Sequence, residues 1–435
     1  MIKNILLIGQ CSLHLGRLEY GNIGNYYIIE PLIKNIQKTF PKAKIKTTFQ
    51  LTDTLCKKTG IIRLPLNLYY SWEKTYLEKA KNELIIAEKY YKTGELKKNT
   101  LYIQEVIKSD LVIDFSGDMW SDNADLVGEN RFLIGLIKDR IAQYFGKKTV
   151  LLAGSPGPFA KNKSIIKFAK EVYKNFDLVT NREPVSTELL KKQGFDVSKT
   201  KNTACPSVLF DNKNKIKKKL IKKNKKLNSK KIIKIGFILS GWNFTKGPFN
   251  KENRSNDEYQ PFIDLLEYIS LNYRAYIFLM SHSNGFKITS NKIVLTHGRD
   301  YYIIKKVEEI IKKRKIAKNI YSLNDIYDPW TTKAIISRFD LLISGRIHGA
   351  MAGLSQGIPT LIIDYGHESK AHKLKGFAKL FSVEKYLADP VKNNELLIKF
   401  DRLWKDRKII KKYLKNNIKK IKNLAVDNFQ YLKNL

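Results

Sequence analysis

The stretch of chain that most limits the possible folds covers residues 340–373, DLLISGRIHGAMAGLSQGIPTLIIDYGHESKAHK. Residues 340–344 hold an apolar run bounded by serine and glycine, which predicts a short buried strand. Residues 349–356 predict a helix that ends near Gly357, and residues 360–364 predict a second buried strand. A strand, a helix and a strand of these lengths form one βαβ unit, and its crossover connection requires a parallel sheet.

Arg346 and His348 lie between the first predicted strand and the predicted helix. Open α/β sheets bind ligands beyond the carboxyl ends of their strands, and the N–H groups at a helix N-terminus favour anions. Arg346 offers a planar fork for a carboxylate or a phosphate, and His348 can exchange a proton near neutral pH. A lone histidine at this place also fits a helix cap or a satisfied surface residue. The pair is therefore a candidate site for an anionic substrate that undergoes acid–base chemistry.

The segment SGRIHGAMAGLSQGIPTLIIDYGHESK resembles the signature of the polysaccharide pyruvyl transferase family, in which an R-x-H pair, a small-residue helix, a G-x-P and a later lysine recur in this order. Other segments follow in the family's order: GNIGN, VIDFSGDMW, AGSPGPF, VTNREPVSTELLKKQG and LMSHS. By this resemblance, Lys370 matches the family's lysine, Arg182 a recurrent arginine before a helix, and His282 a strand-end histidine. The resemblance implies an enzyme of polysaccharide biosynthesis at the cell envelope that uses phosphoenolpyruvate.

A chain of 435 residues suits two domains rather than one core. Residues 212–231 are nearly free of acidic side chains, which predicts a solvated, lysine-rich linker. Strands and helices alternate on both sides of it, in residues 1–211 and 232–435. We predict the α/β fold class with two Rossmann-like βα domains that face a cleft, which resembles the GT-B architecture. The first domain would bind the acceptor, and the second would carry the donor-site signature and the C-terminal helices.

Small and polar residues also follow other predicted strands. Gly24 lies in a glycine-bearing loop that would let the backbone approach a ligand closely, although a simple turn fits equally well. Gly117 and Asp118 follow a buried strand at residues 110–115, and Ser240 follows the first strand of the second domain. Asp118 could hold an acceptor hydroxyl and take its proton, or it could be a solvated loop residue. Arg182 fits either an anion contact or a structural cap.

The family resemblance suggests a division of roles. His348 would donate a proton to the enol carbon of phosphoenolpyruvate, and Asp118 would act as base for the acceptor hydroxyl. Arg346 and Lys370, with Arg182 as a further candidate, would neutralise the anionic groups of this co-substrate. Two alternatives stay open. A GT-B glycosyltransferase would place the pyrophosphate of a nucleotide sugar at the same helix N-terminus. A noncatalytic protein that binds polyanions would use the basic surface alone.

The formal charge of +39 raises nucleic acid or an anionic membrane as partners. The lysines are spread over most of the chain and no nucleic-acid motif is present, so we expect no specific nucleic acid, and only a weak hold on anionic membrane surfaces. No apolar run reaches the roughly 18 residues that span a bilayer, and the opening MIKNILLIGQ predicts a strand. We expect a cytoplasmic protein, with a peripheral position at the inner face of the membrane as an option. Its saccharide acceptor could be lipid-linked.

The three cysteines, Cys11, Cys56 and Cys205, are widely separated and odd in number. This pattern predicts neither a disulfide framework nor a zinc site. The pyruvyl transfer that the resemblance implies, from phosphoenolpyruvate to hydroxyl groups of a saccharide, also requires no redox chemistry. We therefore expect no metal and no cofactor beyond phosphoenolpyruvate as co-substrate.

Overall fold

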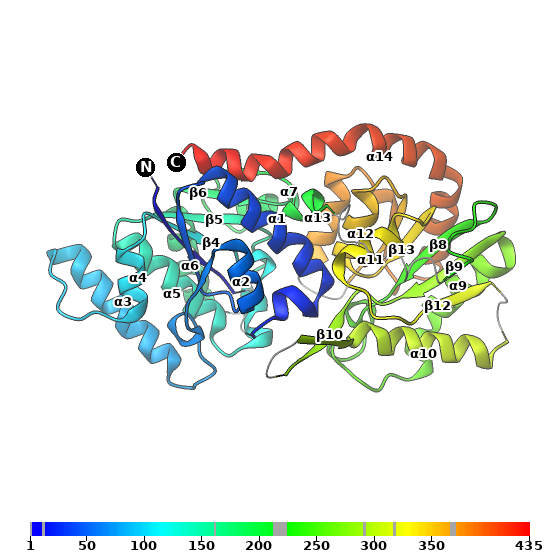
Figure 1. Cartoon of the computed structure of the whole chain (residues 1–435), viewed down its shortest axis with the longest axis horizontal. Coiled ribbons are helices and arrows are strands. Elements are labelled where there is room, and N and C mark those ends of the chain that lie inside the picture. Colours follow the sequence, from blue (N-terminus) through cyan, green and yellow to red (C-terminus); the bar gives the residue numbers. More distant parts are fainter. Residues whose placement is uncertain are drawn as a thin grey trace. The chain divides into compact units, whose positions relative to one another are not determined.

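The computed structural model describes residues 2–10, 14–160, 162–211, 224–289, 293–315, 319–365 and 371–435. The chain divides into two compact units, each built around a parallel sheet (Figure 1). Unit 1 consists of Met1–Leu18, Leu32–Pro206 and Leu424–Leu435, and unit 2 consists of Glu19–Pro31 and Ser207–Asn423. Within these ranges, no helix combines the length and the apolar character needed to cross a membrane.

The described part of unit 1 holds a seven-stranded sheet in the order β3-β2-β1-β4-β5-β6-β7. Every neighbouring pair in it is parallel. The strands are β1 (Asn4–Ile8), β2 (Lys44–Thr47), β3 (Ile62–Arg63), β4 (Leu111–Asp114), β5 (Lys148–Gly154), β6 (Leu178–Asn181) and β7 (Thr200–Asn202). The helices are α2 (Asp53–Thr59), α3 (Tyr76–Thr93), α4 (Leu101–Ile107), α5 (Arg131–Tyr144), α6 (Lys163–Lys174), α7 (Pro184–Lys192) and the second half of α1 (Ile23–Thr39). The strand order reverses between β1 and β4, which is where open α/β sheets bind ligands.

The described part of unit 2 holds a six-stranded parallel sheet in the order β12-β9-β8-β13-β14-β15. Its strands are β8 (Ile233–Ile238), β9 (Ala275–Met280), β12 (Ile320–Leu323), β13 (Leu341–Ser344), β14 (Thr360–Ile363) and β15 (Leu387–Ala388). An antiparallel hairpin, β10 (Asn284–Ile288) and β11 (Ile293–His297), stands apart from this sheet. The helices are α9 (Gln260–Asn272), α10 (Arg299–Lys313), α11 (Pro329–Ile336), α12 (Ile347–Leu354), α13 (His372–Leu380) and most of α14 (Glu395–Lys433). Here the order reverses between β8 and β13.

The βαβ unit predicted from residues 340–364 is present as β13, α12 and β14, and the two strands pair in parallel. Both strands are fully buried, as their apolar runs require. The helix begins at Ile347, two residues before the predicted start, because Arg346 already takes the extended cap conformation. The chain leaves the helix near Gly357, whose φ of 76 favours glycine.

Two short segments belong to a different unit from most of the chain around them. Residues 19–31 belong to unit 2, where Tyr27 packs against Phe210 and His282. Residues 424–435 belong to unit 1, where the buried side chain of Asn428 bonds with Thr180. The predicted domains are contiguous in the chain, so they place residues 19–31 in the first domain and residues 424–435 in the second. Of the predicted linker, residues 212–223 lie outside the described part of the chain.

Candidate functional site

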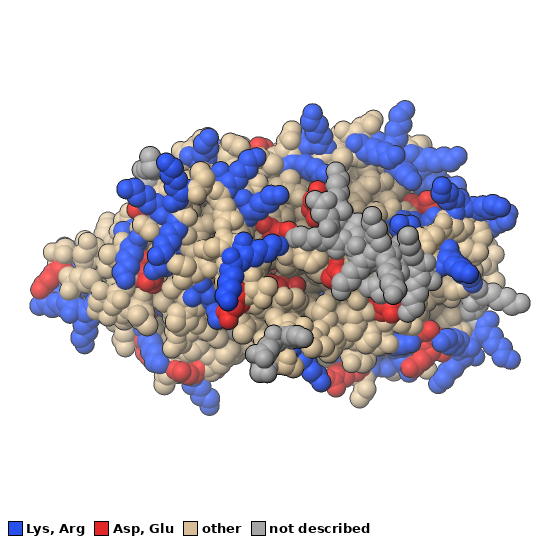
Figure 2. Space-filling view, in the orientation of Figure 1, with Lys and Arg blue, Asp and Glu red and all other residues tan. Residues whose placement is uncertain are grey.

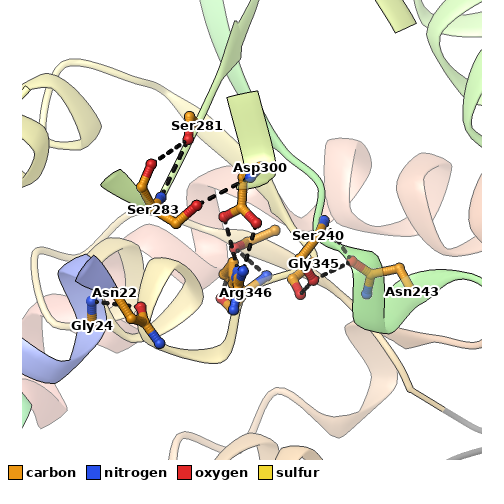
Figure 3. Close-up of polar contacts among 10 residues, drawn as sticks. Asn22, Gly24, Ser240, Asn243, Ser281, Ser283, Asp300, Gly345 and Arg346 are labelled. Carbon is orange, nitrogen blue, oxygen red and sulfur yellow. Dashed lines mark hydrogen bonds and ion pairs between the residues drawn. The ribbon is translucent and has the colours of Figure 1, made fainter. Parts of the chain in front are cut away.

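The loops that follow β8 and β13 are tied to each other where the strand order of unit 2 reverses (Figure 3), and the first of them is also tied to the end of β14. Ser240 Oγ lies 2.9 Å from both Asn243 Oδ1 and the carbonyl oxygen of Gly345, with one hydroxyl proton to donate. Asn243 Nδ2 donates to the carbonyl oxygen of Ile363 at 3.2 Å. A Cβ on Gly345 would lie 2.0 Å from Asn243 Oδ1, so only glycine fits there. These bonds fix the carboxyl ends of the three strands relative to one another.

Arg346 is the cap residue of α12, and its guanidinium is held by Asp300 at the start of α10 (Figure 3). Nε donates to Oδ2 at 2.9 Å and Nη2 donates to Oδ1 at 2.5 Å. The Asp300 side chain is fully buried, and 16% of the Arg346 side chain is exposed. Burial opposes the charge of Arg346, but the Asp300 carboxylate outweighs it and raises the pKa of the guanidinium. The planar fork is therefore charged and fixed in one orientation.

Asp300 is itself held in place by a residue that follows another strand, β9. Its backbone N–H donates to Ser283 Oγ at 3.1 Å, and Ser283 follows β9. Sequence reasoning did not find Asp300 or Asn243 as site residues. No motif marks either one, and the Asp300–Arg346 pair joins positions 46 residues apart in the chain. An acidic residue directly before a predicted helix start is a signal too common to select it.

His348 lies in the first turn of α12, half-buried, with Gly24 packed against it. A Cβ on Gly24 would lie 2.5 Å from His348 Cβ and 2.8 Å from its Nδ1. The Gly24 N–H donates to Asn22 Oδ1 at 3.0 Å (Figure 3). Gly24 lies in the first turn of α1 rather than in the predicted loop, because the helix already begins at Ile23. The expected close backbone approach is nevertheless present, and the group that it approaches is the candidate catalytic imidazole.

His282, which follows β9, is fully buried beside the same site. Within the described part of the chain, neither of its ring nitrogens has a hydrogen-bond partner, and the same holds for the buried hydroxyl of Tyr27. The two rings lie 5.6 Å apart at 70°. Burial, helped by the nearby Arg346 charge, lowers the pKa of His282 to about 3, so its imidazole is neutral at physiological pH. Buried polar atoms without partners commonly accompany bound water or a ligand.

The predicted site residues of unit 1 also come together, after β4 and β6. Arg182 is buried, and its Nε donates to Ser155 Oγ at 2.9 Å. Arg182 Nη2 lies 3.9 Å from Asp118 Oδ1, and 27% of the Asp118 side chain is exposed. Gly117, at a φ of 64, would place a Cβ 3.6 Å from Arg182 Nη1. The structure thus groups Gly117, Asp118 and Arg182 in unit 1, and Gly24, Ser240, His282, Arg346 and His348 in unit 2. Lys370 lies outside the described residues.

Below this edge of unit 1, two acidic residues are buried together. Asp114, the last residue of β4, and Asp139 on α5 are both almost completely buried. Trp120 Nε1 donates to Asp139 Oδ2 at 3.1 Å. Burial raises the pKa of Asp114 to about 7, and burial next to Asp114 raises the pKa of Asp139 as well. Because two buried carboxylates repel each other, we expect the pair to share one proton.

A sequence model of the polysaccharide pyruvyl transferase family matches residues 22–367, which include both groups of site residues. The chain belongs to this family. The match confirms the resemblance read from the R-x-H signature, and it makes the protein a member of a family of transferases. Arg346, His348 and the small-residue helix therefore follow one another in the order of this family's signature. A search of curated protein sequences finds no match to the chain.

Comparison with solved structures identifies the fold class of the chain. HepE from Anabaena in complex with UDP-glucose is 14% identical, with a TM-score of 0.56 over 100% of both chains. Sucrose-phosphate synthase from Thermosynechococcus elongatus is 11% identical, with a TM-score of 0.55 over 99% of this chain and 98% of that one. UDP-GlcNAc 2-epimerase from Neisseria meningitidis is 12% identical, with a TM-score of 0.53 over 97% and 99%. Together with the two parallel sheets, these similarities confirm the GT-B fold class.

Proposed function

We propose that the protein transfers the pyruvyl group of phosphoenolpyruvate to two hydroxyls of a saccharide and forms a cyclic ketal. The observation that carries the proposal is the Arg346 fork, which Asp300 fixes at the first turn of α12, two residues before His348. The family match covers both residues. A fixed cation beside a titratable imidazole suits a doubly anionic donor that must gain a proton.

Donor binding would use two kinds of positive group. Asp300 occupies the Nε–H of Arg346 and one N–H of Nη2. Within the described residues, the remaining N–H groups of the fork are available for a carboxylate or phosphate. The backbone N–H groups at the start of α12 add a second anion site. The further cationic roles of Lys370 and Arg182 remain predictions. The predicted role of Asp118 as base likewise rests on its place at a strand end of unit 1.

The proposed chemistry proceeds in two additions. His348 protonates the terminal CH2 carbon of the enol, and the substituted carbon becomes an oxocarbenium centre. The first saccharide hydroxyl attacks this carbon and loses its proton to a base, for which Asp118 is the candidate. The second hydroxyl then forms the second C–O bond as the C–O bond to phosphate breaks. The phosphate leaves with the bonding electron pair, and the proton of the second hydroxyl restores the His348 acid.

The first test is thermal unfolding at physiological salt with phosphoenolpyruvate, inorganic phosphate or a panel of nucleotide sugars. A ligand at a hundredfold excess over its dissociation constant stabilises the native state by about 2.7 kcal/mol, which shifts the melting temperature measurably. We expect phosphoenolpyruvate to stabilise the protein more than phosphate does. Stabilisation by nucleotide sugars alone would contradict pyruvyl transfer.

The second candidate function is a GT-B glycosyltransferase that uses a nucleotide sugar. The observation in its favour is the similarity to HepE, which was solved with UDP-glucose. The N-terminus of α12 would then hold the pyrophosphate. A noncatalytic polyanion-binding protein is the third candidate, and the same melting experiment separates the three, because that protein would respond to no small donor.

The acceptor is proposed to be a saccharide, free or lipid-linked, and the protein is proposed to associate weakly with anionic membrane surfaces. Figure 2 shows Lys and Arg side chains spread over the visible face of the molecule rather than gathered in one patch. Such a distribution supports weak, salt-sensitive adhesion rather than a defined docking site. Cosedimentation with phosphatidylserine vesicles that is lost at high salt would agree with this, whereas binding that salt does not weaken would not.

A further inference from the structure

A half-exposed tryptophan lies at the ligand-binding edge of unit 1. Trp72 follows β3 and is 51% exposed, although most large apolar side chains of the unit are buried. His14 follows β1, and its ring stacks on Trp72 with centroids 5.3 Å apart and planes 14° apart. Because all strands of this sheet are parallel, both loops leave its carboxyl edge, where α/β sheets bind ligands. We call His14 and Trp72 the aromatic platform.

The aromatic platform has a rigid base. Tyr70 is buried and meets the Trp72 ring edge-on, at 5.5 Å and 88°. The Tyr70 hydroxyl donates to the carbonyl oxygen of Glu129 at 3.1 Å, which ties it to the loop before α5. A Cβ on Gly128 would lie 2.6 Å from that hydroxyl, so the loop can approach only because the residue is glycine. The Trp72 indole is thus exposed to solvent but held in a fixed orientation.

Polar groups also border the aromatic platform. The buried Arg131 lies 5.9 Å from the Tyr70 ring, and its Nε donates to Gln10 Oε1 at 3.2 Å. Partial burial, with the charges of Arg17 and Arg131, lowers the pKa of His14, so its imidazole is neutral at physiological pH. A neutral imidazole offers one hydrogen-bond donor and one acceptor, as a sugar hydroxyl does.

These features select one kind of ligand. A pyranose ring has an apolar face of C–H groups that fits flat against an indole, and a rim of hydroxyls that needs neutral donors and acceptors beside it. A single exposed indole flanked by polar residues is too small an apolar area for a stable protein interface. We propose that His14 and Trp72 form a stacking platform for a pyranose ring of a saccharide. The inference rests on the proposed function for one point, namely that this saccharide is the acceptor.

The test measures saccharide binding without any donor. Saturation-transfer difference NMR on the full-length protein would use methyl glycosides of glucose, galactose, mannose and N-acetylglucosamine, with uridine as the stacking competitor. In the wild type we expect transfer to the ring C–H protons of at least one glycoside. Trp72→Ala should weaken that binding about tenfold. The matched control is Tyr91→Ala, because Tyr91 is also an exposed aromatic residue of unit 1 at 67% but lies on α3.

His14→Ala is the second platform variant, and it should also weaken glycoside binding while Tyr91→Ala leaves it unchanged. Thermal unfolding of each variant checks that the fold is retained. Absence of glycoside binding in the wild type, equal binding by Trp72→Ala, or uridine binding that replaces it would overturn the platform. Platform-dependent glycoside binding in a protein that phosphoenolpyruvate fails to stabilise would overturn the proposed reaction and leave the platform standing.

Discussion

In both units the strand order reverses beside the first strand of a parallel sheet, at β1/β4 in unit 1 and at β8/β13 in unit 2. The carboxyl edges of the two sheets differ in kind. In unit 2 the loops at the reversal are buried and polar, and Asp300 holds the charged fork of Arg346 in one orientation. In unit 1 the carboxyl edge also exposes Trp72, which follows the outer strand β3 and stacks on His14, a residue that follows β1.

In the two proposed sites, the same strand order serves two kinds of ligand. An anion is held best by a fixed charge that has been desolvated before the ligand arrives, because no reorganisation is then needed. A neutral sugar gains more from a flat apolar surface with exchangeable hydrogen bonds at its rim. The two units also treat buried acids differently, since Asp300 has a cation as partner and Asp114 has a second acid, Asp139.

The largest expected effect is on catalysis in unit 2. His348→Ala should reduce turnover by about 10²- to 10⁴-fold, because the proton donor to the enol carbon is lost. Donor binding should persist, since the Arg346–Asp300 pair is intact. Steady-state kinetics together with the donor-induced melting shift would measure both quantities.

His297→Ala is the matched control for this variant, because His297 lies in unit 2 on β11 and stacks on Tyr301. It should leave turnover unchanged. A folded His348→Ala protein that binds the donor and keeps near-normal turnover would contradict the role given to this histidine.

The next effect is on the stability of the fixed cation. Asp300→Asn keeps the shape of the side chain but leaves Arg346 without a counter-charge, and breaking a buried pair in this way costs about 3–5 kcal/mol. Urea unfolding would measure the loss, and donor affinity should fall with it. Glu309→Gln is the control, because its 3.8 Å pair with Lys306 is exposed and should contribute less than about 1 kcal/mol. Equal losses in the two variants would mean that the fork is not held by Asp300.

A smaller effect concerns pH and the paired acids of unit 1. The folded-state pKa of Asp114, about 7, exceeds the value of about 3.9 expected in the unfolded chain, so folding takes up a proton. The stability contribution is complete below the unfolded pKa and is lost as the pH rises through about 7. Asp139 and the Trp120 that bonds to it face the same interior.

Unfolding free energies measured across this pH range should therefore decline in the wild type, and Asp114→Asn should flatten the decline because it removes the titrating group. The Asn variant needs no proton to remain neutral. Parallel pH profiles for the two proteins would show that the pair does not share a proton.

The smallest effect refines the unit 1 side of the comparison. Trp72→Phe retains an aromatic face of smaller area, so glycoside binding should weaken only about two- to threefold. Titration of a glycoside that binds the wild type, followed by NMR, would measure it. A loss as large as that of Trp72→Ala would indicate that the indole N–H, rather than stacking, provides the interaction.

Much of unit 2 was predictable from local pattern. The buried apolar runs of β13 and β14 and the small residues of α12 specify a βαβ unit without reference to the rest of the chain. That unit places Arg346 and His348 at the carboxyl edge of a parallel sheet. The family signature rests on the same short stretch, and the match to the family model confirms it.

The contacts that make these residues a site were not predictable. Asp300 reaches Arg346, Gly24 packs on His348 and His14 stacks on Trp72 only because segments far apart in the chain fold against one another. The exchange of residues 19–31 and 424–435 between the units has the same origin. Aromatic and amide side chains in those segments pack against residues that the local spacing of apolar residues cannot identify.

The sequence by itself determined the fold class, the βαβ signature, the family and the candidate pair Arg346 and His348. These depend on backbone preferences and apolar spacing, which act over a few residues. The tertiary structure alone decided that Asp300 holds Arg346 and that Trp72 is left exposed on a rigid base. Such outcomes depend on which desolvated charges and rings meet when distant segments pack, and a one-dimensional pattern does not contain that information.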